Sequence, residues 1–564
     1  MTNKRKFNEP EYYWDIAKKY IKEKSKELTP TKYYIDEKLA YKCIRFASLL
    51  KHTSGEFAGV NFQFQEWQVH SIVDLFGTKY RHGDYQGLRR YQKALFFMPK
   101  KNGKSEFAGL LHAVMFFIDP DKAKEQYSIA TEIEQAKIIH KVFLTMLKQE
   151  PDLYEMIKST IKPPRISKEN GAFEDEFQSL TSSADTKDGL RPSFLTVDEG
   201  HAHKTMDLYQ IMSDGLAGRN EPLEIHLSTA GYNLQGFFYR LIYKYAKKVK
   251  DGTIKDDRFY AVLFEPSDED LKRDDFWKDK NIWKKANPNL GVSPTYSYMD
   301  GKVAMAEESE EALIAFKTKH LNCWVDKPNT WIKSEIWNRS QTPIRYTKLK
   351  ELRNKTAYAG LDLASTTDIA AFVLIFPDGK GGIDVISRFY LPEDNMRDRV
   401  KIDKVPYLDW VKDGLISTTP GNTIDYDYIE RDILRYCEFF NIKMVAYDRW
   451  NSSQMITNLE KNEVADLIPF GQGFASMSSP TKQVEVLSLQ DKINHGSNEV
   501  LNWMCSNVVL RRDAADNIKI DKDKSIEKVD GMVSLVMALG AYIADTKTEE
   551  DNTSIYETKD LIDL

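Results

Sequence analysis

The sequence predicts an α/β protein with two successive α/β domains. Its 564 residues are too many for one hydrophobic core, so at least two domains are expected. Short apolar runs alternate with helical stretches over residues 86–325, and the alternation begins again over residues 356–545. This alternation is typical of helices packed on the faces of a largely parallel sheet.

The composition excludes a membrane protein and a disulfide-rich scaffold. Hydrophobic residues make up 41% and charged residues 29% of the chain, which are ordinary values for a globular protein. No apolar run approaches the roughly 18 residues of a membrane span, and the start lacks the apolar core of a signal peptide, so we expect a cytosolic protein. The net charge of −5 gives no global attraction to nucleic acid, so any DNA contact needs local basic patches. Four cysteines have neither zinc-site nor disulfide spacing and are expected to be core thiols: Cys43, Cys323, Cys437 and Cys505.

Outside the two α/β blocks, the character of the chain changes at several points. Residues 233–325 are rich in aromatic and charged residues, as a helical lid or linker subdomain would be. Pro328 and Asn329 interrupt an aromatic-rich stretch, which is typical of a domain junction. The expected segments are an N-terminal helical region (1–85), a first α/β domain (86–325), an interdomain linker (326–355), a second α/β domain (356–545) and an acidic, mobile tail (546–564).

The stretch FFMPKKNGKSEFAG, residues 96–109, predicts a phosphate-binding loop. Gly103, Lys104 and Ser105 match the end of the pattern G-x-x-x-x-G-K-[ST], whereas Met98 stands where the first glycine belongs. A strand-like run precedes the loop and a helical stretch follows it, so the loop would lie at a helix N-terminus, whose dipole favours anions. From this stretch alone, a polar turn that contains Gly-Lys-Ser by chance is the alternative. The loop residues expected to bind nucleotide are Lys100, Lys101, Asn102, Gly103, Lys104 and Ser105.

A pair of carboxylates follows a second apolar run, in SFLTVDEGHAH at residues 193–203. In an open α/β sheet such a strand delivers its acids to the carboxyl edge, where ligands bind. Asp198 is expected to hold the Mg²⁺ that also contacts Ser105, and Glu199 to orient or deprotonate the attacking water. An Asp-Glu pair alone is more often a solvated strand end, but its position after the phosphate loop favours ATP hydrolysis.

Other residues carry weaker signals for the nucleotide site. Ser228 and Thr229 end the run EIHLSTAG, where they could sense the γ-phosphate and couple its loss to motion; an ordinary strand exit is the alternative. Gln65 and Gln68, ahead of the loop, could hydrogen-bond an adenine edge. The candidates for a cation that neutralises transition-state charge, as an arginine finger from a neighbouring subunit can, are Lys100, Lys101 and Arg219.

Three acids in the second block predict a separate metal site. Asp362 lies at the centre of an expected strand in YAGLDLASTTDIAAFVLIF, and Asp448 ends another in IKMVAYDRW. A charge inside an apolar strand is costly unless it is paired or binds metal. Asp530 starts a long apolar helix, where a first-turn acid would be the plainer interpretation on its own. Together the three fit a ribonuclease H-like fold, in which converging carboxylates hold two Mg²⁺ or Mn²⁺ ions for phosphodiester hydrolysis.

Residues near these acids are candidates for supporting roles. Asp368 is a candidate accessory acid, although a plain loop residue is the commoner case, and Lys482 is a candidate for a phosphate contact. The stretch NVVLRRDAADNIKIDKDKSIEK predicts a hairpin that could guide DNA. Its candidate DNA-contacting residues are Arg511 and Arg512, with Lys519 and Lys522 nearby. Four acids dilute this charge, so a solvated edge is the alternative: Asp513, Asp516, Asp521 and Asp523.

The combination of motifs resembles the large terminase subunit of tailed double-stranded DNA bacteriophages. The resemblance covers nearly the whole chain and rests, in order, on MPKKNGKSE, TVDEGHAH, LSTAG, GLDLASTTD, VAYDRW, GFASMSSPTK, NVVLRRDAADNIK and EKVDGMVSLVMALG. That family tolerates a degenerate phosphate loop, so Met98 does not exclude ATP. The resemblance implies a P-loop NTPase domain, with an ASCE-type parallel sheet and helices on both faces, followed by a ribonuclease H-like nuclease domain.

The resemblance also implies a motor that cuts concatemeric viral DNA, translocates it into a procapsid with ATP, and cuts again when the head is full. Lys104, Ser105 and Asp198 would then bind ATP and Mg²⁺, and Glu199 would catalyse hydrolysis. The implied ligands of the two nuclease metals are Asp362, Asp448 and Asp530. The implied partners are double-stranded DNA, the portal protein, a small terminase subunit and further copies in a ring, usually a pentamer, with a monomer in solution. The implied location is the host bacterial cytoplasm and transiently the procapsid, not the mature virion.

Two rival functions account for parts of the sequence. A helicase-like or remodelling DNA-dependent ATPase, whose C-terminal domain binds DNA without cutting, predicts ATP hydrolysis but no metal-dependent cleavage. The three acids disfavour it, because an inactive domain has no need of costly buried carboxylates. A stand-alone nuclease with a vestigial ATPase half predicts that Glu199→Gln leaves the biological output unchanged. The two-site interpretation predicts instead that each activity can be removed separately.

Overall fold

The structure of the protein is a computed structural model that describes residues 10–559 with gaps. The residues outside the description are 1–9, 30, 132, 181–188, 204–206, 235, 327–329, 340–345, 354, 364–367, 395, 397–398, 401–404, 449–452, 463–464, 523, 526 and 560–564. Pro328, Asn329 and Asp523 therefore lie outside the described residues. The chain divides into two compact units, Met1–Val325 and Asp326–Leu564, each of which is described by itself. Within the described ranges, no helix is both long and apolar enough to cross a membrane.

The first unit is built on an eight-stranded sheet in the order β10-β3-β9-β8-β4-β7-β6-β5. The strands from β10 to β7 run parallel, whereas β6 and β5 add an antiparallel edge that was not expected from the sequence. The strands are β3 (Lys93–Phe97), β4 (Glu125–Ile129), β5 (Lys158–Ile161), β6 (Pro164–Asn170), β7 (Phe173–Leu180), β8 (Phe194–Asp198), β9 (Leu223–Ser228) and β10 (Phe259–Leu263). Parallel order with helical crossovers places the loops after β3, β8 and β9 at one edge of the sheet.

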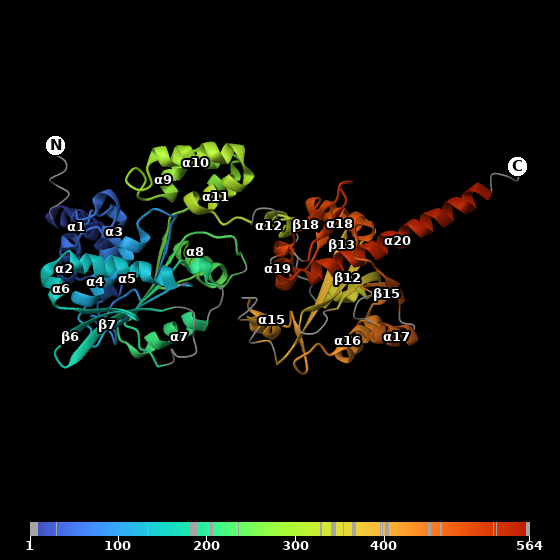
Figure 1. Ribbon diagram of the computed structural model, residues 1–564, viewed down its shortest axis with the longest axis horizontal. Coiled ribbons are helices and arrows are strands. Elements are labelled where there is room, and N and C mark those ends of the chain that lie inside the picture. The colour runs from blue at the N-terminus through green and yellow to red at the C-terminus, as the bar shows by residue number, and fades with distance from the viewer. Residues whose placement is uncertain are drawn as a thin grey trace. The chain divides into compact units, whose positions relative to one another are not determined.

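Helices cover both faces of this sheet (Figure 1). Ala94 and Phe96 of β3 pack on one face with α1 to α5, whereas Leu95 and Phe97 pack on the other with α7, η7 and α8. This alternation is the period of two that a strand buried on both faces requires. The helical elements are α1 (Pro10–Leu28), α2 (Glu37–Leu49), α3 (Glu66–Ile72), α4 (Lys104–Phe117), α5 (Ile133–Lys148), α6 (Pro151–Glu155), α7 (Asp207–Gly215), η7 (Phe238–Tyr243) and α8 (Lys244–Lys250).

Two segments that were expected to be helical contain strands. In the N-terminal region, β1 (Tyr33–Ile35) and β2 (Thr78–Tyr80) pair antiparallel, and β10, inside the expected lid, is an edge strand of the main sheet. These three strands have only three to five residues each, so the helical periodicity of their neighbours dominates a longer sequence window. At the start of the expected lid, η7 and α8 pack on the main sheet, whereas the helices between Lys280 and Leu321 pack around Trp283 and Phe316. These helices are α9 (Lys280–Ala286), α10 (Tyr296–Glu308) and α11 (Glu310–Leu321).

The second unit has a mixed sheet in the order β14-β13-β12-β11-β15-β16, with β17 paired to β13. β11, β12 and β13 are antiparallel neighbours, whereas β15 and β16 run parallel to β11. Three hairpin-connected strands beside two parallel strands form the ribonuclease H-like arrangement predicted from the sequence. The strands are β11 (Thr356–Asp362), β12 (Ala370–Pro377), β13 (Ile383–Pro392), β14 (Ser417–Thr419), β15 (Asn441–Tyr447), β16 (Asp466–Pro469) and β17 (Ile493–Asn494), with a separate hairpin of β18 (Leu510–Arg512) and β19 (Ile518–Ile520).

Two helical layers enclose the second sheet. α16 and α17 pack with Ala359 and Leu361 of β11, whereas α18, α19 and α20 pack with Tyr358 on the opposite face. α12, within the expected linker, instead belongs to this core, because Trp337 is buried and its indole donates to Oδ1 of Asn502 at 2.8 Å. The helices are α12 (Ser334–Trp337), α13 (Tyr346–Leu352), α15 (Tyr407–Lys412), α16 (Tyr426–Phe439), α17 (Ser453–Lys461), α18 (Phe474–Leu489), α19 (Glu499–Asn507) and α20 (Asp530–Lys559).

The segment expected to be a mobile acidic tail is helical as far as Lys559. α20 begins at Asp530 and continues through it as one long helix (Figure 1). No proline or glycine interrupts residues 541–559, so the backbone has no reason to end the helix earlier.

Gly360 lets α20 lie directly on the central strand β11. A Cβ atom built at this position would lie 1.9 Å from the backbone oxygen of Ser534 in α20. Backbone atoms cannot yield as a flexible side chain does, so we expect Gly360→Ala to destabilise the second unit by at least about 3 kcal/mol. Scanning calorimetry should show a large fall in the melting temperature of this unit, with ATP turnover by the first unit retained.

Gly473→Ala is the matched control in the same unit, because a Cβ atom there meets no atom within 4 Å. Equal melting temperatures for the two variants would contradict this account of the contact between α20 and β11.

Candidate active sites

The loop between β3 and α4 has the backbone geometry of an anion-binding turn. α4 begins at Lys104, and Gly103 precedes it in the left-handed conformation, with a φ of 78°. Lys101 has a φ of 70°, which is uncommon for a residue with a side chain. The first turn of α4 leaves backbone N–H groups without partners inside the helix, which suits a phosphate. Met98 is fully buried, so the position of the missing glycine belongs to the core.

Lys104 is folded back onto its own loop. Its Nζ donates to the backbone oxygen of Met98 at 2.9 Å and to Oγ1 of Thr229. Burial lowers the pKa of Lys104, while the carboxylates of Glu199 and Asp198 act in the opposite direction. Phosphate oxygens could replace the oxygen of Met98 and Oγ1 of Thr229, because an ammonium group donates to any of these oxygen acceptors. Ser105 follows in the first turn of α4.

Asp198 is the last residue of β8, and Glu199 follows it at the carboxyl edge of the sheet. Burial, and next the charge of Glu199, raises the pKa of Asp198 to about 7. Oε2 of Glu199 is buried and has no hydrogen-bond partner among the described residues. Nδ1 of His201 lies 3.1 Å away, but burial lowers the pKa of His201, so the ring is neutral at pH 7. Because a neutral ring forms no ion pair with the carboxylate, this buried oxygen is suited to accept a proton.

Ser228 and Thr229 connect the two motifs, because β9 lies between β3 and β8. Oγ of Ser228 accepts the backbone N–H of His201 at 3.1 Å, in the turn that follows Glu199. Oγ1 of Thr229 donates to the backbone oxygen of Met98 at 3.1 Å, in the phosphate loop. The end of β9 therefore contacts both halves of the nucleotide site.

A cavity of about 1050 Å³ lies beside the phosphate loop. Phe62, Trp67 and Gly103 contribute to its lining, and aromatic walls suit a flat purine ring. Gln68 also lines it, but its Oε1 accepts the backbone N–H of Gln65 at 2.9 Å as part of the cap of α3. Part of the hydrogen-bonding capacity of Gln68 therefore serves the helix.

Three asparagines of the lid form hydrogen bonds to the loops of the candidate nucleotide site, and the sequence analysis did not identify them. Nδ2 of Asn102 donates to Oδ1 of Asn287 at 2.8 Å, and Nδ2 of Asn289 donates to the backbone oxygen of Asn102 at 3.0 Å. Oδ1 of Asn322 accepts the backbone N–H of Ala230, directly after Thr229, at 2.8 Å. The one available signal was the position of Asn322 after α11, where its φ of 61° forms a left-handed cap.

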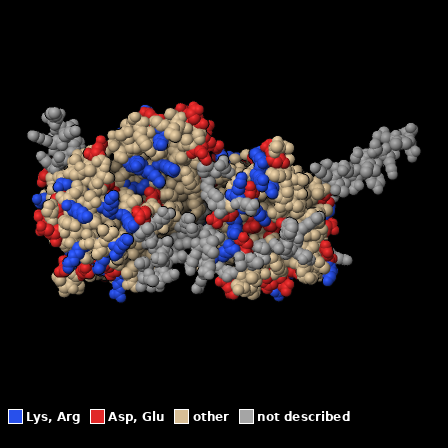
Figure 2. All heavy atoms as spheres, viewed as in Figure 1, with Lys and Arg blue, Asp and Glu red and all other residues tan. Residues whose placement is uncertain are grey.

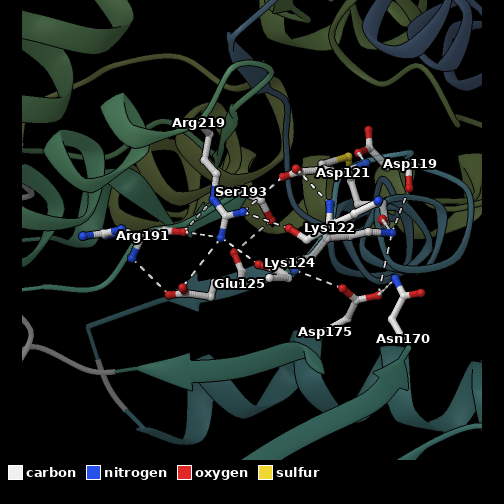
Figure 3. Close-up of polar contacts among 12 residues, drawn as sticks. Asp119, Asp121, Lys122, Lys124, Glu125, Asn170, Asp175, Arg191, Ser193 and Arg219 are labelled. Atoms are coloured by element: carbon white, nitrogen blue, oxygen red, sulfur yellow. Dashed lines mark hydrogen bonds and ion pairs between the residues drawn. The ribbon is translucent and has the colours of Figure 1, made fainter. Parts of the chain in front are cut away.

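Arg219 lies at the opposite edge of the sheet from the phosphate loop. Its guanidinium donates to three backbone oxygens at 2.7–3.1 Å, in the segments that lead into β4 and β8 (Figure 3). The acceptors belong to Lys122, Ala123 and Arg191. These bonds join the amino ends of two strands and do not involve the nucleotide residues of the same chain. By contrast, Lys100 and Lys101 are exposed on the loop itself.

The three acids of the second unit lie on three elements that meet at one end of its sheet. Asp362 is the last residue of β11 and not the centre of a longer strand. The apolar run is divided between β11, which ends at Asp362, and β12, which begins at Ala370. Asp448 directly follows β15, and its backbone N–H donates to the oxygen of Leu361 at 3.4 Å. Asp530 begins α20, which packs on β11. Parallel pairing thus brings the first two acids together, and helix packing brings the third.

Lys522 and Gln472 contact these acids. Nζ of Lys522 lies 2.6 Å from Oδ2 of Asp362 and 3.8 Å from Oδ1 of Asp530. Nε2 of Gln472 donates to Oδ1 of Asp362 at 3.2 Å. Burial, and next the charge of Asp362, raises the pKa of Asp530 to about 7. The sequence suggested Lys522 only as part of a basic hairpin and did not single out Gln472.

The donor chemistry of this cluster fits a hard divalent cation. Carboxylate oxygens are the ligands that Mg²⁺ and Mn²⁺ prefer, and Oδ2 of Asp530 is buried without a hydrogen-bond partner among the described residues. The present spacing does not form a closed metal cage. In the part of the chain that the structure describes, no group of three or more His, Cys, Asp or Glu side chains is arranged to hold a metal ion.

The other candidate residues lie around this cluster. Asp368 pairs with Lys528 at 2.7 Å, and its charge contributes to the raised pKa of Asp530. Arg511 and Arg512 are exposed on β18, and Lys482 is exposed on α18. Arg512 pairs with Asp516 at 2.6 Å. On the face shown in Figure 2, basic and acidic side chains of the described residues are interspersed.

A P-loop ATPase unit followed by a ribonuclease H-like unit with three converging acids defines an ATP-driven, DNA-cutting enzyme. Residues 66–248 match the family described as the ATPase domain of the terminase large subunit, and residues 253–546 match its endonuclease domain. The chain belongs to the terminase large-subunit family. Its ATPase and endonuclease domains use nucleotide and divalent metal, and they act on DNA within the phage packaging machinery.

The chain is also similar to two curated relatives and to one solved structure. The chain is 29% identical over 455 residues to the large terminase subunit of Enterobacteria phage HK97. The aligned part covers 79% of this chain and 86% of that relative. It is 26% identical over 365 residues to protein YmfN of Escherichia coli strain K12, with coverages of 63% and 78%. The crystal structure of the HK97 large terminase aligns with a TM-score of 0.49 and 24% identity, over 89% of this chain and 99% of that chain.

Proposed function

We propose specific roles for the residues of the ATPase site. Lys104 and the N–H groups at the start of α4 bind the phosphates, Ser105 and Asp198 hold Mg²⁺, and Glu199 takes the proton of the attacking water. The buried, unpartnered Oε2 of Glu199 supports the last role. Ser228 and Thr229 transmit the loss of the γ-phosphate, which their contacts to both motifs support.

For the cation that neutralises transition-state charge, we propose Lys100 or Lys101 rather than Arg219. Both lysines are exposed on the loop, whereas the guanidinium of Arg219 already donates to three backbone oxygens.

In the second unit, Asp362, Asp448 and Asp530 bind two Mg²⁺ or Mn²⁺ ions. When bound, such a pair stabilises the attacking and the leaving oxygen of a phosphodiester hydrolysis. Asp362 and Asp448 orient the cluster from neighbouring strands, and Asp530 closes it from α20. Arg511, Arg512 and Lys482 contact the backbone of the duplex, for which their exposure is the support.

The biological activity that follows is ATP-driven packaging of double-stranded DNA into a procapsid, with cleavage of concatemeric DNA. The partners we propose are the portal protein, a small terminase subunit and further copies of this chain in a ring on the portal, in the host cytoplasm. The single observation that carries the proposal is that each unit gathers its own acids beside a lysine: Asp198 and Glu199 near Lys104, and Asp362 and Asp530 at Lys522.

A DNase-protection assay tests packaging. Wild-type protein, portal-bearing procapsids of the same phage and linear duplex DNA should give DNA that resists DNase only when ATP is present. Procapsids without portal protein are the control and should protect nothing. Cleavage and ATP turnover without any protected DNA, at every ratio of protein to procapsid, would contradict the packaging role.

A further inference from the structure

The side chain of Lys522 lies among the acids that the proposed nuclease reaction needs. Its Nζ is 2.6 Å from Oδ2 of Asp362 and 3.8 Å from Oδ1 of Asp530, and the charge of Asp448 also acts on it. The other oxygen of Asp362 accepts a hydrogen bond from Gln472 at 3.2 Å. Both oxygens of Asp362 therefore have donors, and one ammonium group balances part of the negative charge of the acids.

We infer that Lys522 competes with divalent cations for the acids of the nuclease site and moves to a DNA phosphate when the cations bind. The inference rests on the nuclease function proposed above. Oδ2 of Asp362 cannot ligate a cation along the direction in which it accepts the ammonium N–H. A divalent cation and an ammonium group at the same acids also repel each other. Pairing of Lys522 with Asp362 and loading of the site are therefore alternatives.

The local structure allows Lys522 to move while its backbone stays in place. The N–H of Asp521 donates to the backbone oxygen of Val509 at 2.9 Å, and Oγ of Ser525 donates to the backbone oxygen of Asp521 at 2.7 Å. The side chain of Lys522 is 37% exposed, whereas that of Asp362 is 3% exposed. Rotation about side-chain bonds is thus enough to carry the ammonium group toward the solvent side.

This competition links metal binding to DNA binding. A lysine displaced from Asp362 regains a favourable partner when a phosphate lies nearby, so a bound duplex favours the displaced lysine and hence the bound cations. Linkage of this kind is reciprocal, so bound cations also favour DNA. Without a duplex, Lys522 stays paired with the acids, which weakens cation binding until DNA occupies the site.

Mn²⁺ binding to the full-length protein, measured by isothermal titration calorimetry without nucleotide, tests the competition. Methionine at position 522 keeps an unbranched side chain that is one atom shorter and removes the charge. We expect Lys522→Met to bind Mn²⁺ about tenfold more tightly than the wild type, because a charge-assisted contact no longer opposes binding. Lys524→Met removes an equal charge from an exposed lysine of the same segment and should leave the affinity within about twofold of wild type.

Asp362→Asn identifies the signal that comes from the nuclease site, because only that part of the titration should disappear. If Asp362→Asn removes no Mn²⁺ binding that the wild type shows, the proposed nuclease site itself is wrong. If Asp362→Asn removes such binding and folded Lys522→Met binds Mn²⁺ no more tightly, the competition alone is overturned. Should Lys522→Met fail to fold, Lys522→Gln, which also removes the charge and has a shorter side chain, takes its place with the same expectation.

A phosphorothioate duplex, whose backbone keeps its charge, tests the link to DNA. Adding it should raise the Mn²⁺ affinity of the wild type more than that of Lys522→Met, since only the wild type has a lysine to transfer. Equal increases in the two proteins would overturn the transfer of Lys522 to phosphate.

Discussion

Asp362→Asn is expected to abolish DNA cleavage and to leave ATP turnover unchanged. Asp362 is buried at the end of β11 and is the acid on which Lys522, Gln472 and Asp448 all act. An amide keeps the size of the side chain but loses the charge that binds a cation. Changes to groups that only support a metal ligand cost about 10–100-fold, so the loss of a ligand should lower the cleavage rate at least about 100-fold.

The measurement is the rate of plasmid nicking and linearisation in Mn²⁺, beside steady-state ATP turnover by the same preparation. Asp378→Asn is the matched control in the second unit, because Asp378 lies in the turn after β12 and its carboxylate accepts from the backbone N–H groups of that turn. It should cut at the wild-type rate. Loss of both activities in folded Asp362→Asn would contradict two independent centres.

Glu199→Gln is expected to abolish ATP hydrolysis while nucleotide binding and DNA cleavage persist. Glutamine retains the shape of the side chain but cannot accept a proton, and a positioned general base contributes about 10²–10⁴-fold to a rate. We therefore expect kcat for ATP to fall by about 10²–10⁴-fold. Binding of a fluorescent ATP analogue should change little, because Lys104 and the start of α4 are unaltered.

Asp214→Asn provides the control for Glu199→Gln within the first unit. Asp214 lies on α7, where its carboxylate accepts exposed hydrogen bonds from the amide of Gln210 at 3.2 and 3.4 Å, so its change should leave kcat unaltered. If Glu199→Gln hydrolysed ATP within about threefold of the wild-type rate, Glu199 would not be the base. Another acceptor near the γ-phosphate would then have to be sought.

The residues that the sequence identified share one property: each stands out in the local sequence. Gly103, Lys104 and Ser105 match a known spacing between a strand and a helix. Asp362 places a charge inside an apolar run, and Asp448 places one at the end of another. Such exceptions are visible without any knowledge of the fold, because a buried charge or a left-handed turn needs a reason.

The contacts that the sequence did not reveal join distant segments of the chain. Lys522 reaches Asp362 across 160 positions, and Asn102 reaches Asn287 across 185 positions. Gly360 looks like any strand glycine until α20 lies on it. Local patterns cannot report such pairs, since tertiary packing alone brings them together.

Segment boundaries were missed for a related reason. Trp337 lies in a stretch that looks like a linker, but its indole has a partner in Asn502 and its ring stacks on His495 with centroids 4.4 Å apart. β10 is only a few residues long between helical stretches, so neighbours with helical periodicity hid it. In both cases, long-range packing determined a structure that the local sequence pattern did not predict.

The central claim is that one chain carries a metal-dependent nuclease and an ATPase as separate centres. The most direct test measures plasmid cleavage by the full-length protein in Mn²⁺, in Mg²⁺ and in EDTA, with Asp448→Asn in parallel and ATP turnover recorded for both preparations. The account predicts cleavage by the wild type in metal only, none by the folded variant, and equal ATP turnover by the two proteins. Cleavage that survives in EDTA or in Asp448→Asn would contradict it.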